Sequence, residues 1–275
     1  MTPHPNPPPT IKQLLAFYLE AGVDCALTDE PVNRLAEPEI VPTTAAAVAP
    51  RETAPPRALR EMPAMVPAAP RADAAIAPDV AISSAREAAR TAPSLEALRA
   101  LLENFDGCAL KHTATRLVFA DGNPQARVMF VGEAPGRDED IEGLPFVGRS
   151  GKLLDRMIAA IGLDRNKAYI ANVIPWRPPG NRTPTPQETQ ICLPFIQRQI
   201  ELCNPEVLVT VGQPSTGALL GVQGIMKNRG RWFPYNTGTR EIRAMPMLHP
   251  AYLLRTPIAK RQAWRDMLAI KKALG

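Results

Sequence analysis

The chain has 275 residues, and 45% of them are hydrophobic, which is enough for one large domain or two small ones with a real core. No apolar run is long enough to cross a bilayer, and the first ten residues lack the charged and apolar regions of a signal peptide, so we expect a soluble, cytoplasmic protein with no membrane partner. The net charge of +5 permits a polyanionic partner but does not require one. Four cysteines without a CxxC pair argue against a disulfide framework.

The first part of the chain differs in composition from the rest. Sixteen of the 31 prolines precede Ser94, and residues 37–79 are almost all Ala, Pro, Val, Glu and Arg, with no aromatic residue. Such a composition cannot bury enough apolar surface to offset its ordering entropy, so residues 36–82 are predicted to be a disordered linker. Before it, in an N-terminal segment of residues 1–35, residues 10–22 have the pattern of an amphipathic helix. We expect this helix to pack on its own domain rather than to bind a partner.

The rest of the chain, residues 83–275, alternates between predicted helices and strands. Apolar periodicity predicts helices at residues 94–105, 150–161, 185–203, 215–220 and 257–274. Thr185, Pro186 and Glu188 mark the start of the third helix as an N-cap, a first-turn proline and a capping-box acid. Apolar runs predict strands at residues 127–131, 168–174, 207–211 and 242–248, and an edge strand at residues 112–119. This order predicts an α/β fold in which a four-stranded, mainly parallel sheet lies between helix layers, an α/β/α sandwich.

Residues 127–155 hold the stretch around which the chain is organised: an apolar strand, a polar loop and a helix, in that order. In open α/β proteins, ligands bind at the loops that leave the carboxyl ends of the strands. Glu133, Asn172 and His249 each fall at or just beyond the end of a different predicted strand. Because those ends share one edge of a parallel sheet, we expect these three residues to line one cleft.

One short pattern in this stretch points to a different function. Residues 143–150, GLPFVGRS, nearly match the phosphate-binding loop G-x-x-x-x-G-K-[ST], with Arg149 in place of the lysine. However, the preceding strand ends well before Gly143, and Pro145 removes a backbone N–H from a loop that would have to donate them. The sequence therefore argues against nucleotide hydrolysis.

Three segments carry a resemblance to a known family: GEAPGRDEDIEGLPFVG, YIANVIPWRPPGNRTP and HPAYLLR, in this order. Together they resemble the uracil-DNA glycosylase superfamily, and within it the family 4 type, over residues 105–275. The resemblance implies a four-stranded parallel sheet between helices and an enzyme that acts on a uracil flipped out of DNA. The implied partner is DNA containing uracil, single or double stranded, and we expect the protein to be a monomer.

The resemblance also assigns roles in the loop after the first confident strand. Glu133 and Ala134 occupy the motif that builds the uracil pocket and handles the attacking water, and Gly136 belongs to the same pocket. A carboxylate here can orient the water and offset the positive charge of the sugar in the transition state. We expect Glu133 to do so, with Asp138 and Asp140 as alternatives. The main interpretation of residues 138–140, however, is a solvent-exposed acidic run that leads into a helix.

Three further residues complete the implied pocket. Phe146 matches the aromatic residue on which uracil stacks, Asn172 the amide that reads N3–H and O4 of the base, and His249 the imidazole that faces O2. A donor beside O2 stabilises the uracil anion as the glycosidic bond breaks. Taken singly, Phe146 would be core, His249 a hydrogen-bonded structural histidine and Asn172 the end of a strand. Their shared sheet edge and the resemblance favour the functional roles.

Basic and apolar residues near the same edge are candidates for contacts with DNA. Arginines on loops beside a cleft suit phosphate groups, and the candidates are Arg177, Arg182, Arg229 and Arg255. One apolar side chain is expected to enter the base stack as the uracil leaves. The candidates for this wedge are Tyr252, Leu253 and Leu254, although adjacent leucines before a helix are equally often core.

The chain departs from the family 4 pattern at its cysteines. The resembling enzymes carry an iron–sulfur cluster on four cysteines, and the corresponding positions here are Phe105, Cys108, Trp176 and Cys192. Cys203 lies along the same predicted helix as Cys192, about 16 Å away at the usual helical rise, which is too far to replace a missing ligand. Because the cluster takes four thiolates and only two of the four positions hold cysteine, we expect no cofactor.

The sequence therefore predicts a monofunctional uracil-DNA glycosylase, a hydrolase that flips out uracil, cleaves its N-glycosidic bond and leaves an abasic site for base-excision repair. The proline-rich loop at residues 175–184 lacks the histidine through which a related group links covalently to the abasic sugar, so ordinary turnover is expected. The alternative is a non-catalytic or tight-binding module that recognises uracil or abasic sites in DNA. Release of uracil from an oligonucleotide separates the two.

Overall fold

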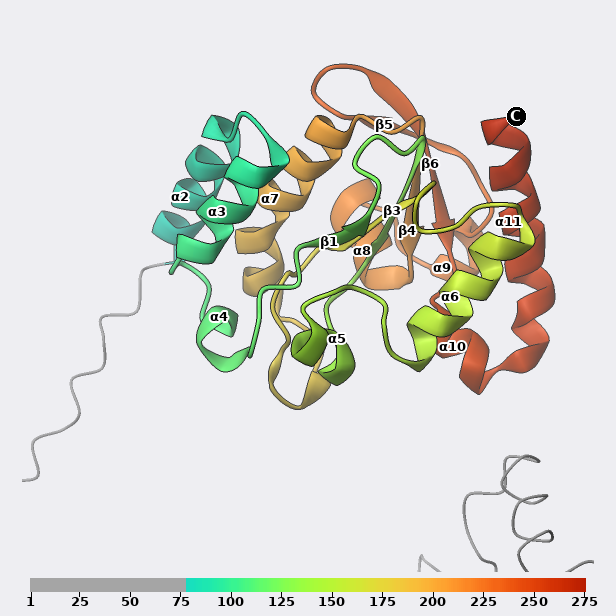
Figure 1. Ribbon diagram of the computed structural model, residues 1–275, viewed down its shortest axis with the longest axis horizontal. Helices are drawn as coiled ribbons and strands as arrows, with labels where there is room; N and C mark the ends of the chain where they lie inside the picture. The colour runs from blue at the N-terminus through green and yellow to red at the C-terminus, as the bar shows by residue number, and fades with distance from the viewer. Residues whose placement is uncertain (1–77) are drawn as a thin grey trace, which may run out of the picture. The chain divides into compact units, whose positions relative to one another are not determined.

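A six-stranded sheet forms the centre of residues 78–275, the part of the chain that the computed structural model describes (Figure 1). The strands lie in the order β1-β3-β2-β4-β6-β5. In chain order they are β1 (Ala120–Gly122), β2 (Val128–Gly132), β3 (Tyr169–Asn172), β4 (Val207–Val211), β5 (Phe233–Asn236) and β6 (Glu241–Met247). The central strands β3, β2, β4 and β6 pair in parallel, whereas β1 and β5 pair antiparallel with their neighbours at the two edges.

The α/β fold and its parallel centre are confirmed, but the expected number of four strands was too small. The edge strand expected at residues 112–119 is wrong, because that stretch overlaps a short helix and β1 starts just beyond it, at Ala120. β5 has no predicted counterpart. It contains Pro234 and only one buried residue, as suits a short edge strand, so it lacks the apolar run that marks the central strands.

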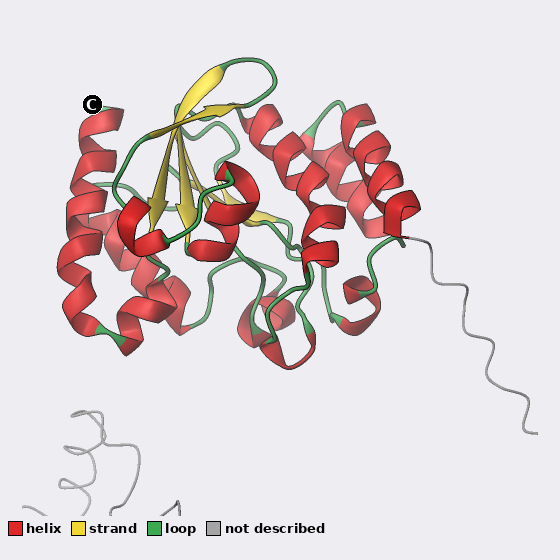
Figure 2. Cartoon of the chain, turned by 180° about the vertical axis from the view of Figure 1, so that it is seen from behind, coloured by secondary structure: helices red, strands yellow, loops and turns green. Residues whose placement is uncertain are grey.

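Helices cover both faces of the sheet (Figure 2). In chain order they are α2 (Pro78–Thr91), α3 (Leu95–Asn104), α4 (Leu110–Thr113), α5 (Arg137–Glu142), α6 (Arg149–Ala160), α7 (Pro186–Cys203), α8 (Gln213–Leu220), α9 (Ile225–Asn228), α10 (Pro250–Arg255) and α11 (Lys260–Leu274), with 3-10 turns η1 (Pro179–Asn181) and η2 (Pro257–Ala259). The helix expected at residues 257–274 thus begins as the turn η2. Within residues 78–275, no helix combines the length and the apolar character that a bilayer crossing requires.

Successive residues of the central strands point into different layers. In β2, Met129 and Val131 join the core cluster that includes α2, α3 and α7, whereas Val128 and Phe130 join the cluster that includes α6 and α11. Every residue of β2 and of β4 is buried. Continuous apolar runs predict these strands because helices cover both faces of a parallel sheet.

Helix α2 belongs to the folded part of the chain. Its alanines Ala81, Ala85 and Ala89 are buried in the core cluster that α7 also joins, and small side chains let the two helices approach closely. The described fold therefore begins at Pro78, inside the stretch that composition assigned to the linker. Alanine is the best helix former, so an alanine-rich stretch can be helical where a partner helix buries it. The expected helix at residues 10–22 and the rest of the linker lie outside the described residues.

Candidate active site

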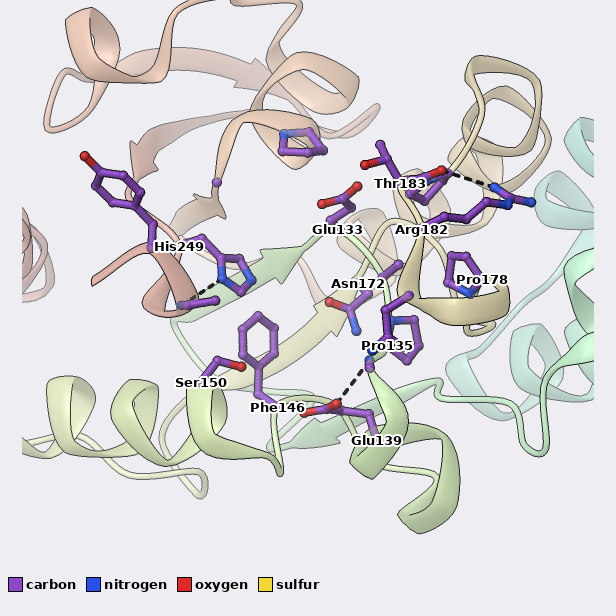
Figure 3. Close-up of a pocket in the computed structure, with 18 of the residues that line it drawn as sticks. Glu133, Pro135, Glu139, Phe146, Ser150, Asn172, Pro178, Arg182, Thr183 and His249 are labelled. Carbon is purple, nitrogen blue, oxygen red and sulfur yellow. Dashed lines mark hydrogen bonds between the residues drawn. The ribbon is translucent and has the colours of Figure 1, made fainter. Parts of the chain in front are cut away.

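A cavity of about 580 Å³ opens at the carboxyl ends of the parallel strands. Its wall is formed by the loop after β2, the start of α6, the loop after β3, the start of α8 and the start of α10. Glu133, Asn172 and His249 all lie in this wall, so three residues from distant parts of the chain share one cleft (Figure 3). Ala134 and Gly136 line it as well. The volume is in the range of small-molecule binding sites.

Gly132, the last residue of β2, brings two functional groups together. It pairs with Asn172 at the end of the neighbouring strand β3. A Cβ at Gly132 would lie 2.5 Å from Oδ1 of Asn172 and 2.6 Å from Cζ of Phe146, so only glycine lets the amide and the ring meet over the strand end. Asn172 is 5% exposed, and its amide makes no hydrogen bond within residues 78–275. Its donor and its acceptor are therefore free for a ligand in the cavity.

Phe146 has a backbone conformation that few L-residues adopt. Its φ of 55° lies in the left-handed region, which costs about 1–2 kcal/mol for a residue with a Cβ. The ring stacks on the imidazole of His249, with the ring centroids 5.7 Å apart and the planes inclined by 28°. Strain of this kind persists only where the surroundings impose it, and it is concentrated at functional sites.

His249 is the N-cap of α10, and its Nδ1 accepts a hydrogen bond from the backbone N–H of Ala251 at 3.1 Å. In the neutral ring the proton is then on Nε2. Burial, with a smaller effect from the positive charge of Arg255, lowers the pKa of His249 to about 4. The imidazole is therefore neutral near pH 7 and has one N–H donor left for a ligand. Gly212, with a φ of 94°, packs against it, because a Cβ there would lie 3.2 Å from Cβ of His249.

Glu133 is the carboxylate that follows β2 in the cavity wall. It is half-buried, and burial alone raises its pKa, since no charged or hydrogen-bonding partner acts on it in the described part of the chain. An unpaired carboxylate in a cleft, with a pKa shifted by desolvation, is typical of a group that acts on a substrate or a water molecule.

Among the other acids of this loop, Asp140 differs from the expectation. Asp140 is 3% exposed and accepts hydrogen bonds from the N–H and hydroxyl of Thr115, at 2.8 and 2.9 Å, and from the N–H of Arg116 at 3.2 Å. The expectation of a solvated acid is therefore wrong for Asp140. Its carboxylate is occupied by the hydrogen bonds from Thr115 and Arg116, so it is not available to orient a water molecule. Asp138 is exposed and does not line the cavity. Glu139 does line it and was missed, although its place three residues after a helix N-cap is the signal of a capping acid.

Comparisons with known proteins agree with this geometry. The family model of the uracil DNA glycosylase superfamily matches residues 119–268, more than half of the chain. The chain belongs to this superfamily. It is 39% identical to the type-4 uracil-DNA glycosylase of Sulfurisphaera tokodaii over 185 residues, which are 65% of this chain and 84% of the relative. It is 41% identical to the type-4 uracil-DNA glycosylase of Thermotoga maritima over 165 residues, 58% of this chain and 83% of the relative. The resemblance to family 4 is confirmed.

Three of the four arginines that were expected to contact DNA remain candidates in this superfamily member. Arg182 and Arg255 line the cavity, and Arg177 lies in the same loop as Arg182. Arg182 pairs with Glu188 at 2.6 Å and Arg177 with Asp140 at 3.8 Å, but their side chains are 44% and 26% exposed. Arg229 pairs with Asp266 of α11, and the side chain of Arg229 is only 16% exposed. Its partner is 2% exposed, so this buried pair holds α11 in place and leaves Arg229 no free face for a phosphate. We therefore remove Arg229 from the set.

The three wedge candidates differ in exposure. Leu253 is 1% exposed in a small apolar cluster with Leu248 and Ala263, so it cannot enter a base stack without breaking that cluster. Tyr252 lines the cavity and Leu254 is 37% exposed. Of the three candidates, Tyr252 and Leu254 are therefore the ones that are not packed into this cluster's buried part.

The four positions that hold cysteines in the family 4 pattern form a packed apolar cluster. Phe105 and Trp176 are buried, and the ring of Phe105 packs edge-on against Phe195 with the centroids 5.0 Å apart. Cys108 and Cys192 are fully buried, with their Sγ atoms 3.9 Å apart. Two thiols and two aromatic side chains do not fit an iron–sulfur cluster, which takes four thiolates as ligands. In the part of the chain that the structure describes, no group of three His, Cys, Asp or Glu residues is placed to hold a metal ion.

Proposed function

We propose that the protein is a monofunctional uracil-DNA glycosylase, which hydrolyses the N-glycosidic bond of uracil in DNA and leaves an abasic site for base-excision repair. One observation carries the proposal: an unpaired carboxylate, a free amide and a neutral imidazole line a single cavity. The similarity to relatives that bear the name type-4 uracil-DNA glycosylase supports it. The proposed partner is DNA that contains uracil, single or double stranded, bound by a monomer.

The base enters the cavity after it has been flipped out of the stack, since an enzyme cannot reach the glycosidic bond of a stacked base. The ring of Phe146 gives the flipped base a flat apolar surface. The amide of Asn172 accepts from N3–H of uracil and donates to O4. Cytosine presents a lone pair at N3 and an amino group at the next position, so the same amide meets it poorly. The free donor and acceptor of Asn172 support this role.

The leaving group is a uracil anion, and His249 stabilises it as it forms. The proton on Nε2 donates to O2 while Nδ1 stays bound to the N–H of Ala251. The low pKa keeps the ring neutral, so the donor is present at physiological pH without a second charge in the site. Removal of one donor of this kind lowers an enzyme's rate by about a hundredfold to a thousandfold.

Glu133 orients the attacking water and offsets the positive charge that develops on the sugar. Its carboxylate has no other partner in the described residues, so it is free for both tasks. General-base assistance contributes about a hundredfold to ten-thousandfold in rate. Ala134 and Gly136 complete the wall without adding side chains that would fill the cavity.

The DNA backbone is held by Arg182 and Arg255, which line the cavity, and by Arg177 in the same loop as Arg182. Arginines on flexible stems bind phosphate groups in this way and do not read the sequence. Tyr252 or Leu254, both in α10, fills the space that the flipped nucleotide leaves in the stack.

A labelled oligonucleotide with a single uracil tests the proposal. The expected result is release of uracil and an abasic strand that alkali cleaves, with turnover in excess of the enzyme. A protein that retains the oligonucleotide but leaves the base in place would refute the glycosylase and support a module that only recognises uracil or abasic sites.

A further inference from the structure

The segment at residues 145–148 carries the aromatic wall of the cavity and joins α5 to α6. Its second residue, Phe146, has the left-handed backbone described above, with a φ of 55°. An L-residue returns to an ordinary conformation unless neighbouring groups prevent it. The groups that prevent it here lie on both sides of the segment: Arg165 lies outside the cavity, whereas Glu139 lines it.

Arg165, in the loop between α6 and β3, holds the carbonyl groups of this segment. Its guanidinium donates to the carbonyl of Pro145 at 3.1 Å and to the carbonyl of Phe146. The guanidinium is itself fixed by ion pairs with Asp121 of β1 and, at 2.9 Å, with Asp155 of α6. Its planar fork of donors thus meets four acceptors at once, which an ammonium group could not do.

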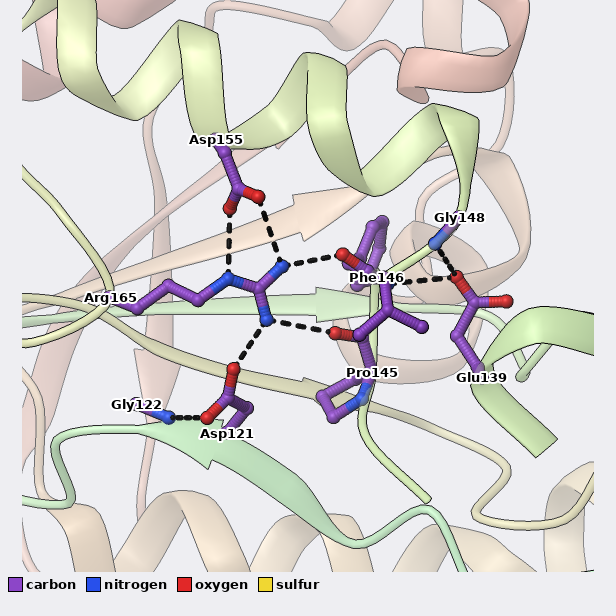
Figure 4. A network of polar contacts seen from close by, with 9 residues as sticks. Asp121, Gly122, Glu139, Pro145, Phe146, Gly148, Asp155 and Arg165 are labelled. Carbon is purple, nitrogen blue, oxygen red and sulfur yellow. Dashed lines mark hydrogen bonds and ion pairs between the residues drawn. The ribbon is translucent and has the colours of Figure 1, made fainter. Parts of the chain in front are cut away.

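The other side of the segment is held through its amide groups. The carboxylate of Glu139 accepts hydrogen bonds from the N–H groups of Val147 and Gly148, each at 3.0 Å. Gly151 of α6 lies directly against the carbonyl of Phe146, since a Cβ at Gly151 would be 1.7 Å from that oxygen. Figure 4 shows Arg165 on one side of the segment and Glu139 on the other.

We infer that Arg165 is a positioning residue for the base: by holding the carbonyls of Pro145 and Phe146, it keeps the ring of Phe146 flat against the site where uracil binds. The inference rests on the proposed function. Without the fork, the backbone of Phe146 relaxes and the ring leaves its place beside His249. Stacking is present in the bound complex and in the transition state alike, so its loss weakens binding more than it slows the chemical step.

The test compares R165Q with the parent and with R198Q. We expect R165Q to raise the KM for the uracil oligonucleotide, and the inhibition constant of free uracil, by about tenfold or more, the size of a lost base–aromatic stack. The change in kcat should be smaller. R165K, which keeps the charge but not the fork, should show most of the same rise and serves if R165Q does not fold.

Arg198 is a matched control on α7, outside the cavity. Its side chain is 21% exposed against 23% for Arg165, it pairs with Glu201 at 2.6 Å, and it donates twice to the carbonyl of Ala92, at 3.0 and 2.7 Å. R198Q should therefore lower Tm about as much as R165Q and leave both constants at the parent value. If R165Q, R165K and R198Q all have the same KM for the oligonucleotide and the same inhibition constant for uracil, the inference is overturned.

A double-mutant cycle with F146A tests whether Arg165 acts through that ring. If it does, adding R165Q to F146A changes the KM and the inhibition constant by less than about twofold, because F146A has already removed the stacking of the base on the ring. Additive effects would assign Arg165 some other role and overturn the inference. The proposed function fails separately, when the parent protein itself releases no uracil.

Discussion

The cavity and the apolar cluster around Cys108 and Cys192 use buried groups in opposite ways. In the cavity wall, Glu133 and Asn172 have no partner in the described residues, and Phe146 keeps a strained backbone. In the cluster, Phe105 and Trp176 are buried in the same core as the two thiols. The first region gives up stability to keep groups free for a ligand, and the second gains stability from packing. Substitutions in the two regions should therefore separate activity from stability.

The largest effect on activity is expected from E133Q, which should lower the single-turnover rate of uracil excision by about a hundredfold to ten-thousandfold. Stability should not fall. Because the folded protein raises the pKa of Glu133, it disfavours the charged carboxylate at a pH above the ordinary glutamate value, and this penalty disappears as the pH falls below that value. At pH 7 the Tm of E133Q should equal or exceed that of the parent. E142Q, at an exposed acid of α5, is the control and should change neither quantity.

H249Q should lower the excision rate by about a hundredfold to a thousandfold, as expected when the donor to a developing anion is no longer held in its place. The substitution keeps a side-chain N–H donor but not the ring that stacks on Phe146 or the fixed Nδ1 acceptor. H112Q, at a surface histidine, is the matched control and should excise uracil at the parent rate. An H249Q protein as active as H112Q would remove His249 from the mechanism.

The same histidine predicts a pH dependence of stability. The folded pKa of about 4 lies below the ordinary value of 6.5, so the unfolded chain binds a proton in that interval and the folded protein does not. The stabilisation is fully present above pH 6.5 and is lost as the pH falls to about 4. The Tm of the parent should therefore fall more steeply than that of H249Q over this interval. Parallel Tm curves would show that His249 is not held neutral by the fold.

In the apolar cluster the expected effect is on stability alone. F105A removes a buried ring that packs against Phe195, and it should cost about 3–5 kcal/mol of unfolding free energy, measured by urea denaturation. The excision rate per folded molecule should stay at the parent value. F233A, in the edge strand β5, replaces a less buried ring and should cost less. A large loss of activity in folded F105A would break the separation between the two regions.

Short sequence patterns were enough to predict the central strands and the start of helix α7. The central strands are continuous apolar runs, and β4 covers the predicted residues 207–211. Helix α7 begins where its capping box predicts, with Thr185 and Glu188 bonded reciprocally at 3.2 and 2.7 Å. Glu133, Asn172 and His249 could be placed together because each lies at or just beyond the end of a parallel strand, and such strands end at one edge.

The missed features depend on partners that are remote in the sequence. Asp140 is bonded to residues more than twenty positions away, and Arg229 is paired with Asp266, so neither partner is visible in a local window. The choice between Leu253 and Leu254 is a matter of which one faces the core, and two adjacent leucines give no period. The edge strands β1 and β5 are too short, and too little buried, to produce an alternating or continuous apolar signal.

The smallest effect is expected from C108A. Cys108 and Cys192 are fully buried with their Sγ atoms 3.9 Å apart, and the other two positions of the family pattern hold Phe105 and Trp176, whereas an iron–sulfur cluster takes four thiolates. The substitution should cost about 1 kcal/mol, the usual size for a single change, and leave excision unchanged. An iron chelator should likewise have no effect on the parent, and metal analysis should find no stoichiometric iron. A brown parent protein that loses both its iron and its activity in C108A would show that two cysteines suffice for a cluster, and the contrast between the two regions would then fail.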